Sequence, residues 1–274
     1  MKLTNHIYKG ANERESLIDF QEPEGFDYKN IIIFVHGYKG YKDWGAWNLV
    51  QDYFVKGGYA FCKFNMSHNG GTTDEPIDFP DLDAFSRNRY TYELTDLESV
   101  LAWIEEKIDI SDKNIHLIGH SRGGGISLLK GNDPRIKSIV TWASISDIGS
   151  RFPQGETLEK WKENGSYTIE NARTKQKMPH QYIMYEDFIK NKDVLNIESK
   201  AKELKKPVLH IHGDNDDSVS ITESESLSVW TEGKLIVINE ANHTFGTYQP
   251  FEAKEMPNKL HEACVLSLQF FEKL

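Results

Sequence analysis

The chain has 274 residues, of which 38% are hydrophobic and 27% are charged, and its formal net charge is -10 at pH 7. A chain of this length and composition can bury a substantial core, in one large domain or two small ones. Because phosphate backbones and anionic lipids attract basic surfaces, the acidic balance argues against nucleic acid and membrane partners. The polar N-terminus and the two cysteines, Cys62 and Cys264, in apolar contexts favour a cytoplasmic protein with buried thiols.

Short β-branched runs alternate with longer helical patterns along most of the chain, which indicates βα units around a mostly parallel sheet flanked by helices. Residues 16–20 predict an antiparallel edge hairpin before the first βα unit. The strand at 31–35 is continuously apolar, so we expect both faces of the sheet to be covered. Further strands are predicted at 59–64, 115–118, 136–142, 208–211 and 235–238, and helices at 92–108 and 260–271.

The alternation stops between about residues 146 and 202, where polar and charged residues mix with aromatic ones and no strand pattern is evident. A bare loop of this length between two buried strands would be unusual. The sequence therefore predicts a small helical cap at 146–202, inserted into a core domain of residues 1–145 and 203–274. We expect the cap to form one wall of the substrate pocket through at least one aromatic residue of the group Trp161, Tyr182, Tyr185 and Phe188.

A glycine-rich motif joins the strand predicted at 115–118 to an apolar helix start. It reads Gly119-His120-Ser121-Arg122-Gly123, which is G-x-S-x-G in a strand-turn-helix context. Such a turn forces its central residue into strained backbone geometry, and glycines let the strand and the helix approach closely. The helix N-terminus favours negative charge that develops beside it. We therefore predict Ser121 as a nucleophile.

A serine hydroxyl needs a base that is itself oriented by a carboxylate. The strand predicted at 208–211 runs into an acidic turn with Asp214, Asp216 and Asp217, and the next strand runs into a loop with His243. Of the 10 histidines, His243 alone follows both the serine and the acidic turn on a loop. We predict His243 as the general base and one of the three aspartates as its partner. No spacing of His, Cys or carboxylates resembles a metal site.

The oxyanion formed by acyl attack needs two preorganised N–H donors. One donor is predicted to be the backbone N–H of Arg122, directly after the serine. The other should come from the loop after the first strong strand, His36-Gly37-Tyr38-Lys39-Gly40, whose glycines let the backbone curl toward the serine. The backbone N–H of Tyr38 is the candidate.

The segments at 36–40, 119–124, 212–219 and 243–245 together resemble the α/β-hydrolase superfamily, in the group that includes dienelactone-hydrolase-like proteins, serine-aminopeptidase-like proteins and acyl esterases such as feruloyl esterases. The resemblance covers the chain from about residue 30 to its end. It implies a sheet of about eight strands with the site at its carboxyl edge. Through the family's Gly-x-x-Asp-x-x-Val pattern, starting at Gly213, it favours Asp216 as the acid, with Asp214 as the runner-up. A dienelactone hydrolase would have cysteine in place of Ser121, so that particular activity is not expected.

The favoured function is a serine hydrolase that cleaves carboxylic esters of small molecules through an acyl-enzyme, without a cofactor or a metal. A peptidase or amidase would use the same machinery, and an N-terminal peptidase needs acidic groups to hold the substrate ammonium. Acidic cap residues available for that role are Glu156, Glu159, Glu170, Glu186 and Asp187. A thioesterase or an acyltransferase would use the same machinery and is a rarer alternative. A ligand-binding module of this fold without catalysis is a further alternative, but such proteins usually lack the serine, the acid or the histidine of the catalytic triad. The sequence leaves open the acyl and alcohol groups accepted, the mobility of the cap, and a homodimer.

Overall fold

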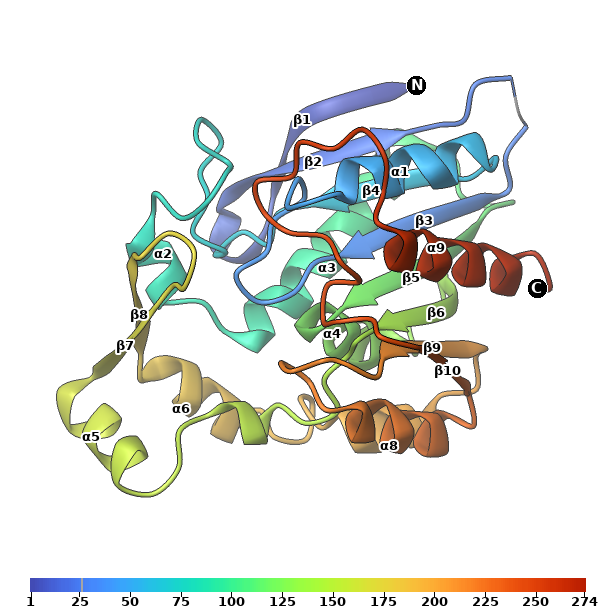
Figure 1. The fold of residues 1–274 in the computed structure, drawn as a ribbon. Coiled ribbons are helices and arrows are strands. Elements are labelled where there is room, and N and C mark those ends of the chain that lie inside the picture. The colour runs from blue at the N-terminus through green and yellow to red at the C-terminus, as the bar shows by residue number, and fades with distance from the viewer. Residues whose placement is uncertain (26) are drawn as a thin grey trace.

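The computed structural model describes residues 1–25 and 27–274. Its central sheet has eight strands in the order β1-β2-β4-β3-β5-β6-β9-β10 (Figure 1). The strands of this sheet are β1 (Lys2–Lys9), β2 (Glu15–Gln21), β3 (Asn30–Val35), β4 (Ala60–Phe64), β5 (Asn114–His120), β6 (Ile136–Trp142), β9 (Val208–Gly213) and β10 (Lys234–Ile238). Within this sheet, the neighbouring strands β4, β3, β5, β6, β9 and β10 pair in parallel. Strand β2 pairs antiparallel with both β1 and β4. The expected edge hairpin is therefore present, and the expected strands are confirmed.

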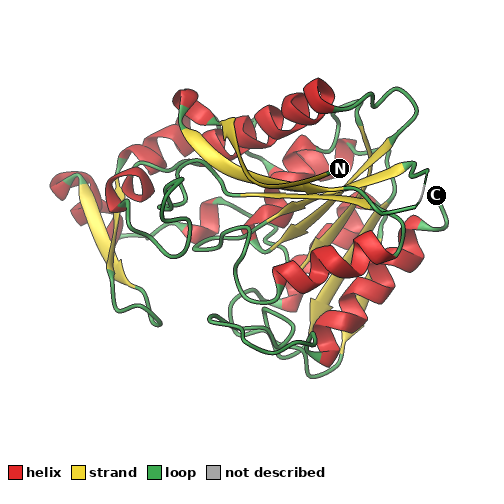
Figure 2. Ribbon diagram, turned by 90° about the horizontal axis from the view of Figure 1, so that it is seen from above, coloured by secondary structure: helices red, strands yellow, loops and turns green. Residues whose placement is uncertain are grey.

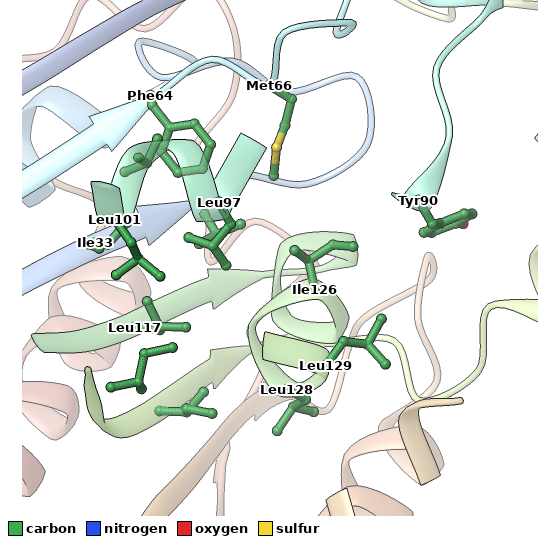
Figure 3. Packing of buried hydrophobic residues seen from close by; sticks show 14 of the residues in the cluster. Ile33, Phe64, Met66, Tyr90, Leu97, Leu101, Leu117, Ile126, Leu128 and Leu129 are labelled. Atoms are coloured by element: carbon green, nitrogen blue, oxygen red, sulfur yellow. The ribbon is translucent and has the colours of Figure 1, made fainter. Parts of the chain in front are cut away.

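Helices cover both faces of the sheet (Figure 2). Among the described residues, the α-helices are α1 (Trp47–Lys56), α2 (Leu82–Ser86), α3 (Tyr90–Lys107), α4 (Arg122–Lys130), α5 (Glu156–Asn164), α6 (Ile183–Lys190), α7 (Ile197–Glu203), α8 (Ile221–Thr231) and α9 (Asn258–Phe271). Buried side chains of α3, α4 and α8 form the core on one face, part of which is shown in Figure 3, and those of α1 and α9 form the core on the other face.

Alternate residues of β3 explain why this strand is apolar throughout. Ile31 and Ile33 belong to the core on the α3 side, and Ile32 and Phe34 belong to the core on the α1 side. All four are at most 1% exposed. A parallel strand between two helical layers has no solvent face, so both of its side-chain rows must be apolar.

The segment between β6 and β9 is not purely helical, and the prediction of a helical cap is wrong in this respect. It contains an antiparallel hairpin of β7 (Ser166–Glu170) and β8 (Lys177–Gln181), besides the helices α5, α6 and α7 and a short 3-10 helix at Gly149–Arg151. Tyr167 and Ile169 alternate with exposed residues along β7, which is the period-2 pattern of a half-buried strand. The hairpin packs against α2.

The boundary predicted at residue 202 falls inside α7. This helix packs against α4 and α8 in the layer that covers the sheet. Its buried residues Ile197 and Ala201 explain why it stays with the main body of the molecule. The part of the insertion that stands away from the sheet is formed by α5, β7, β8 and α6 (Figure 1).

Parallel pairing places the loops after β3, β5, β9 and β10 at the carboxyl edge of the sheet. This edge is where ligands bind in open α/β sheets. The four loops carry Tyr38, Ser121, Asp216 and His243 respectively. The topology therefore collects residues that are far apart in the sequence into one region.

Candidate active site

Ser121 occupies a sharp turn between β5 and α4. Its backbone has a φ of 56° and a ψ of -121°, a conformation that side chains rarely adopt. The turn fits only because its neighbours are glycines. A Cβ atom added to Gly119 would lie 2.4 Å from the Gly123 carbonyl oxygen, and one added to Gly123 would lie 2.1 Å from the Val35 carbonyl oxygen. The G-x-S-x-G pattern thus has a steric cause in this chain.

The carboxylate that contacts His243 belongs to Asp216. The Nδ1 atom of His243 lies 2.7 Å from Oδ2 of Asp216, whose side chain is 1% exposed. The other oxygen, Oδ1, accepts backbone N–H bonds from Ser218 at 2.8 Å and Val219 at 2.9 Å. His212 Nε2 lies 3.1 Å from Oδ2. Asp214 accepts a hydrogen bond from the Glu240 backbone instead.

These contacts keep Asp216 ionised. Burial by itself raises the pKa of the carboxyl, but the hydrogen bonds from His212, His243 and the backbone, with the charge of His243, outweigh it and bring the pKa well below its usual range. An ionised acceptor at Nδ1 holds the proton on that nitrogen of His243 and leaves Nε2 free to accept a proton.

His120 fixes the other side of the His243 loop. Its Nε2 atom lies 2.9 Å from the His243 carbonyl oxygen. Burial, and next to it the charge of His243, lower the pKa of His120 to about 3, so the ring is neutral and donates this bond.

Ser121 and His243 line the same two cavities, although no hydrogen bond joins the Ser121 hydroxyl to the His243 ring among the described residues.

The loop after β3 passes directly against Ser121. A Cβ atom on Gly37 would lie 2.9 Å from the Cβ atom of Ser121. Within the described ranges, neither the backbone N–H of Tyr38 nor that of Arg122 donates a hydrogen bond to a protein acceptor. Free N–H groups on both sides of a serine are the feature that an oxyanion hole requires.

Two cavities meet at Ser121 and share Tyr38, Lys39, Ser121 and His243 as lining residues. The smaller, of about 260 Å³, is also lined by Gly37, Gly40, Trp44, Trp47, Phe79, His120, Asn171, Ala172, Arg173 and Thr244. The larger, of about 410 Å³, is also lined by Tyr90, Arg122, Ile145, Arg151, Phe152, Tyr167, Ile169, His180, Met184, Ser218 and Val219. We call them the small cavity and the large cavity.

The aromatic residues predicted to bind substrate do not line either cavity. Trp161, Tyr182, Tyr185 and Phe188 pack with one another and against Phe152. The cap does form a wall, but through other residues: Phe152, Tyr167, Ile169, His180 and Met184. The alternation of Tyr167 and Ile169 was the available signal, because it marks one face of a strand.

Sequence reasoning also missed two side-chain roles in the predicted oxyanion residues. The Arg122 guanidinium lies 4.4 Å from the ring centre of Tyr38 and 4.6 Å from that of Tyr90, and it donates to Glu93 at 3.1 Å. The Tyr38 hydroxyl lies 2.7 Å from His180 Nε2. This bond ties the loop after β3 to the cap hairpin.

Over the described part of the chain, no group of three or more His, Cys, Asp or Glu residues is arranged to hold a metal ion. Among the same residues, no helix is long and apolar enough to cross a membrane.

No family model matches the chain. It is 24% identical over 172 residues to a Bacillus subtilis (strain 168) protein named uncharacterized peptidase YtmA. The aligned residues make up 62% of this chain and 56% of the relative. It is 26% identical over 181 residues to an uncharacterized 31.7 kDa protein of the traX-finO intergenic region of Escherichia coli, which covers 65% of this chain and 57% of the relative. The chain thus matches less than two thirds of the length of each curated relative.

Solved structures match over nearly the whole chain. A structure of Est1E from Butyrivibrio proteoclasticus with ferulic acid bound has a TM-score of 0.72 at 19% identity, covering 98% of each chain. A putative hydrolase from Agrobacterium vitis S4 has a TM-score of 0.71 at 15% identity, covering 98% of this chain and 97% of that one. The Pyrococcus furiosus esterase Pf2001 has a TM-score of 0.65 at 15% identity, covering 100% and 91%. Together with the strand order and the turn at Ser121, these likenesses identify the fold of this chain as the α/β-hydrolase fold.

Proposed function

We propose that this protein is a serine hydrolase that cleaves carboxylic esters of small molecules by two-step acyl transfer. The observation that carries the proposal is the Asp216–His243 hydrogen bond of 2.7 Å at cavities that also contain Ser121 in a strained turn. Two structural neighbours, a domain of a Rhodothermus marinus protein and Pf2001 of Pyrococcus furiosus, are named esterases, which supports the same chemistry.

The mechanism assigns one task to each group. The Ser121 hydroxyl attacks the ester carbonyl while Nε2 of His243 accepts its proton, and Asp216 stabilises the imidazolium that forms. The backbone N–H groups of Tyr38 and Arg122 bind the oxyanion. His243 then protonates the departing alcohol, and a water molecule, deprotonated by His243, releases the acid and restores Ser121. These steps need no cofactor.

An amide-cleaving alternative is favoured by one observation, the name of the Bacillus subtilis relative. The acidic cap residues considered for binding a substrate ammonium are Glu156, Glu159, Glu170, Glu186 and Asp187, and none of them lines either cavity. Both cavities carry lysine and arginine side chains instead. This charge pattern disfavours a substrate with a free ammonium group and supports the ester proposal.

The proposal is tested by assaying the purified protein against matched esters and aminoacyl amides. We expect turnover of small activated esters and much slower cleavage of aminoacyl amides. Faster cleavage of the amides would replace the ester proposal with the peptidase one. Labelling by a fluorophosphonate probe separates both from a binding module without catalysis, because an inert pocket would not react at Ser121.

A further inference from the structure

The large cavity beside Ser121 has a charge that contrasts with the rest of the molecule. The chain has a formal net charge of -10, yet the ionisable residues that line this cavity include Lys39, Arg122 and Arg151 and no aspartate or glutamate. A cavity lined by cationic side chains and by no carboxylate favours an anionic ligand, even in an acidic protein.

The carboxylates that pair with the two arginines are not part of the cavity lining. Arg122 pairs with Glu93, and Arg151 pairs with Glu223, but neither glutamate lines the large cavity. The Lys39 ammonium lies 5.3 Å from the ring centre of Tyr38 and makes no ion pair with another described residue. Burial, and next to it the charge of Arg122, lower the pKa of Lys39.

Two donors of the same wall have no partner. Tyr90, the first residue of α3, is 1% exposed, and its hydroxyl makes no hydrogen bond to a described residue. Figure 3 shows Tyr90 apart from the side chains that pack on the sheet. The Nε atom of Arg151 is also buried without a partner. Unpaired buried donors are costly, so two of them at one cavity point to an acceptor that binds there.

The remaining lining defines the shape of the group that carries the acceptor. Ile145, Phe152, Ile169 and Met184 give the large cavity an apolar surface, and its volume is about 410 Å³. A cavity of this kind fits a flat or aliphatic body of moderate size.

We propose that the ester substrate carries a carboxylate, which binds in the large cavity against Arg122, Arg151 and Tyr90 while the ester group lies at Ser121. This inference rests on the proposed esterase function and adds the substrate class, namely esters whose acyl or alcohol part bears a second, ionised carboxyl group. Arginine suits this task because its planar guanidinium matches a carboxylate.

The test compares pairs of rigid esters in which a carboxylate is replaced by a neutral carboxamide of nearly the same shape. One pair is methyl 4-carboxybenzoate and methyl 4-carbamoylbenzoate, with the variable group on the acyl side. The other is 4-carboxyphenyl acetate and 4-carbamoylphenyl acetate, with that group on the alcohol side. We expect kcat/KM to be at least about tenfold higher for the carboxylate of one pair, the effect of one charge-assisted hydrogen bond. Equal kcat/KM within both pairs overturns the carboxylate proposal and leaves the esterase intact, whereas no cleavage of any ester overturns the proposed function itself.

Variants locate the carboxylate. Tyr90→Phe removes only the unpartnered hydroxyl, and Arg151→Gln removes one cation. Both should lower kcat/KM for the preferred carboxylate ester by about fivefold or more and lower that for its carboxamide partner by less, so that the preference for the carboxylate falls. Arg151→Lys should restore part of the preference. Arg173→Gln is the matched control, because Arg173 lines only the small cavity and should not change the preference. Loss of the preference in Arg173→Gln alone would contradict the assignment to the large cavity.

Discussion

The side chain of Ser121 is presented to the cavities by a strained backbone. Residues held in sparsely populated conformations cost about 1–3 kcal/mol each and persist where the surrounding structure determines them. Here the Ser121 N–H donates to the Trp142 carbonyl oxygen at 2.8 Å, and the Ser121 carbonyl oxygen accepts from the N–H of Gly124 at 3.0 Å. The main-chain bonds of two neighbouring elements therefore hold Ser121, the proposed nucleophile, in place.

At the same scale, Asp216→Asn tests the orientation of the base. The amide cannot stabilise the imidazolium and can donate to Nδ1, which favours the wrong tautomer of His243. We expect kcat for a small ester to fall by about 10³ to 10⁴. Asp214→Asn is the control, because Asp214 lies in the same turn but bonds to the Glu240 backbone. Equal losses in the two variants would argue that the turn as a whole, and not the Asp216 carboxylate, supports His243.

At the scale of elements, the loop after β3 and the hairpin β7–β8 form a single unit through the bond from Tyr38 to His180. His180 is 4% exposed, and burial, with the charge of Arg122 next, lowers its pKa to about 4. The neutral ring accepts from the Tyr38 hydroxyl at Nε2. A cap strand thus helps to hold the loop that presents one proposed oxyanion donor.

Tyr38→Phe should therefore lower the free energy of unfolding by about 0.5–1.5 kcal/mol, the usual net contribution of one hydrogen bond, and also lower kcat. Denaturant unfolding and steady-state kinetics measure the two effects. Tyr53→Phe is the matched control, because the Tyr53 hydroxyl bonds to no described residue. An unchanged kcat in Tyr38→Phe would show that the backbone of this loop is positioned without the cap.

The cap should control substrate choice through β7 and not through its aromatic cluster. Tyr167→Ala opens the large cavity and should change the ratio of kcat/KM between an acetyl ester and a bulky aromatic-acid ester by about tenfold. Tyr182→Ala removes a residue that packs against Trp161 and Tyr185, so it should lower stability and leave the ratio unchanged. The reverse pattern would indicate that the aromatic cluster, and not β7, controls substrate choice.

The sequence predicts well those strands whose side chains are buried on both faces, because their residues are then apolar throughout. β3 is buried on both faces, so its apolar run is unambiguous. β1 and the hairpin strand β8 are mostly exposed or only partly buried, and their polar residues conceal the strand pattern. The large cavity could not be predicted, because Tyr90, Arg151 and Tyr167 meet only in three dimensions.

At the scale of the whole molecule, buried histidines link stability to pH. Burial lowers the pKa of His36 and His116 to about 4 and that of His210 to about 3, from an ordinary value of 6.5. The unfolded chain therefore binds more protons than the folded one between these values. The free energy of unfolding is therefore not reduced by these histidines above about pH 6.5, and it decreases as the pH falls from there toward the pKa values of the folded state.

His210→Gln measures the contribution of one such group. His210 is fully buried between Thr141 and Thr231, on β9 and before the loop that carries Asp216. Between about pH 6.5 and 4, the free energy of unfolding falls with falling pH in the parent protein and should fall less steeply in the variant. The two slopes should differ by up to roughly 1.4 kcal/mol per pH unit. Parallel pH dependences of the two proteins would show that His210 takes up no proton on unfolding in this range.

The measurement that tests the central claim most directly is the turnover of a small activated ester by the Ser121→Ala variant, compared with the parent protein at equal concentration. The fold of the variant is checked by circular dichroism and thermal unfolding, and removing one hydroxyl at this turn should leave both unchanged. The account predicts a loss in turnover of about three to six orders of magnitude, because the nucleophile is gone while the remaining site is intact. Turnover by a folded Ser121→Ala variant at a rate comparable to that of the parent protein would contradict it.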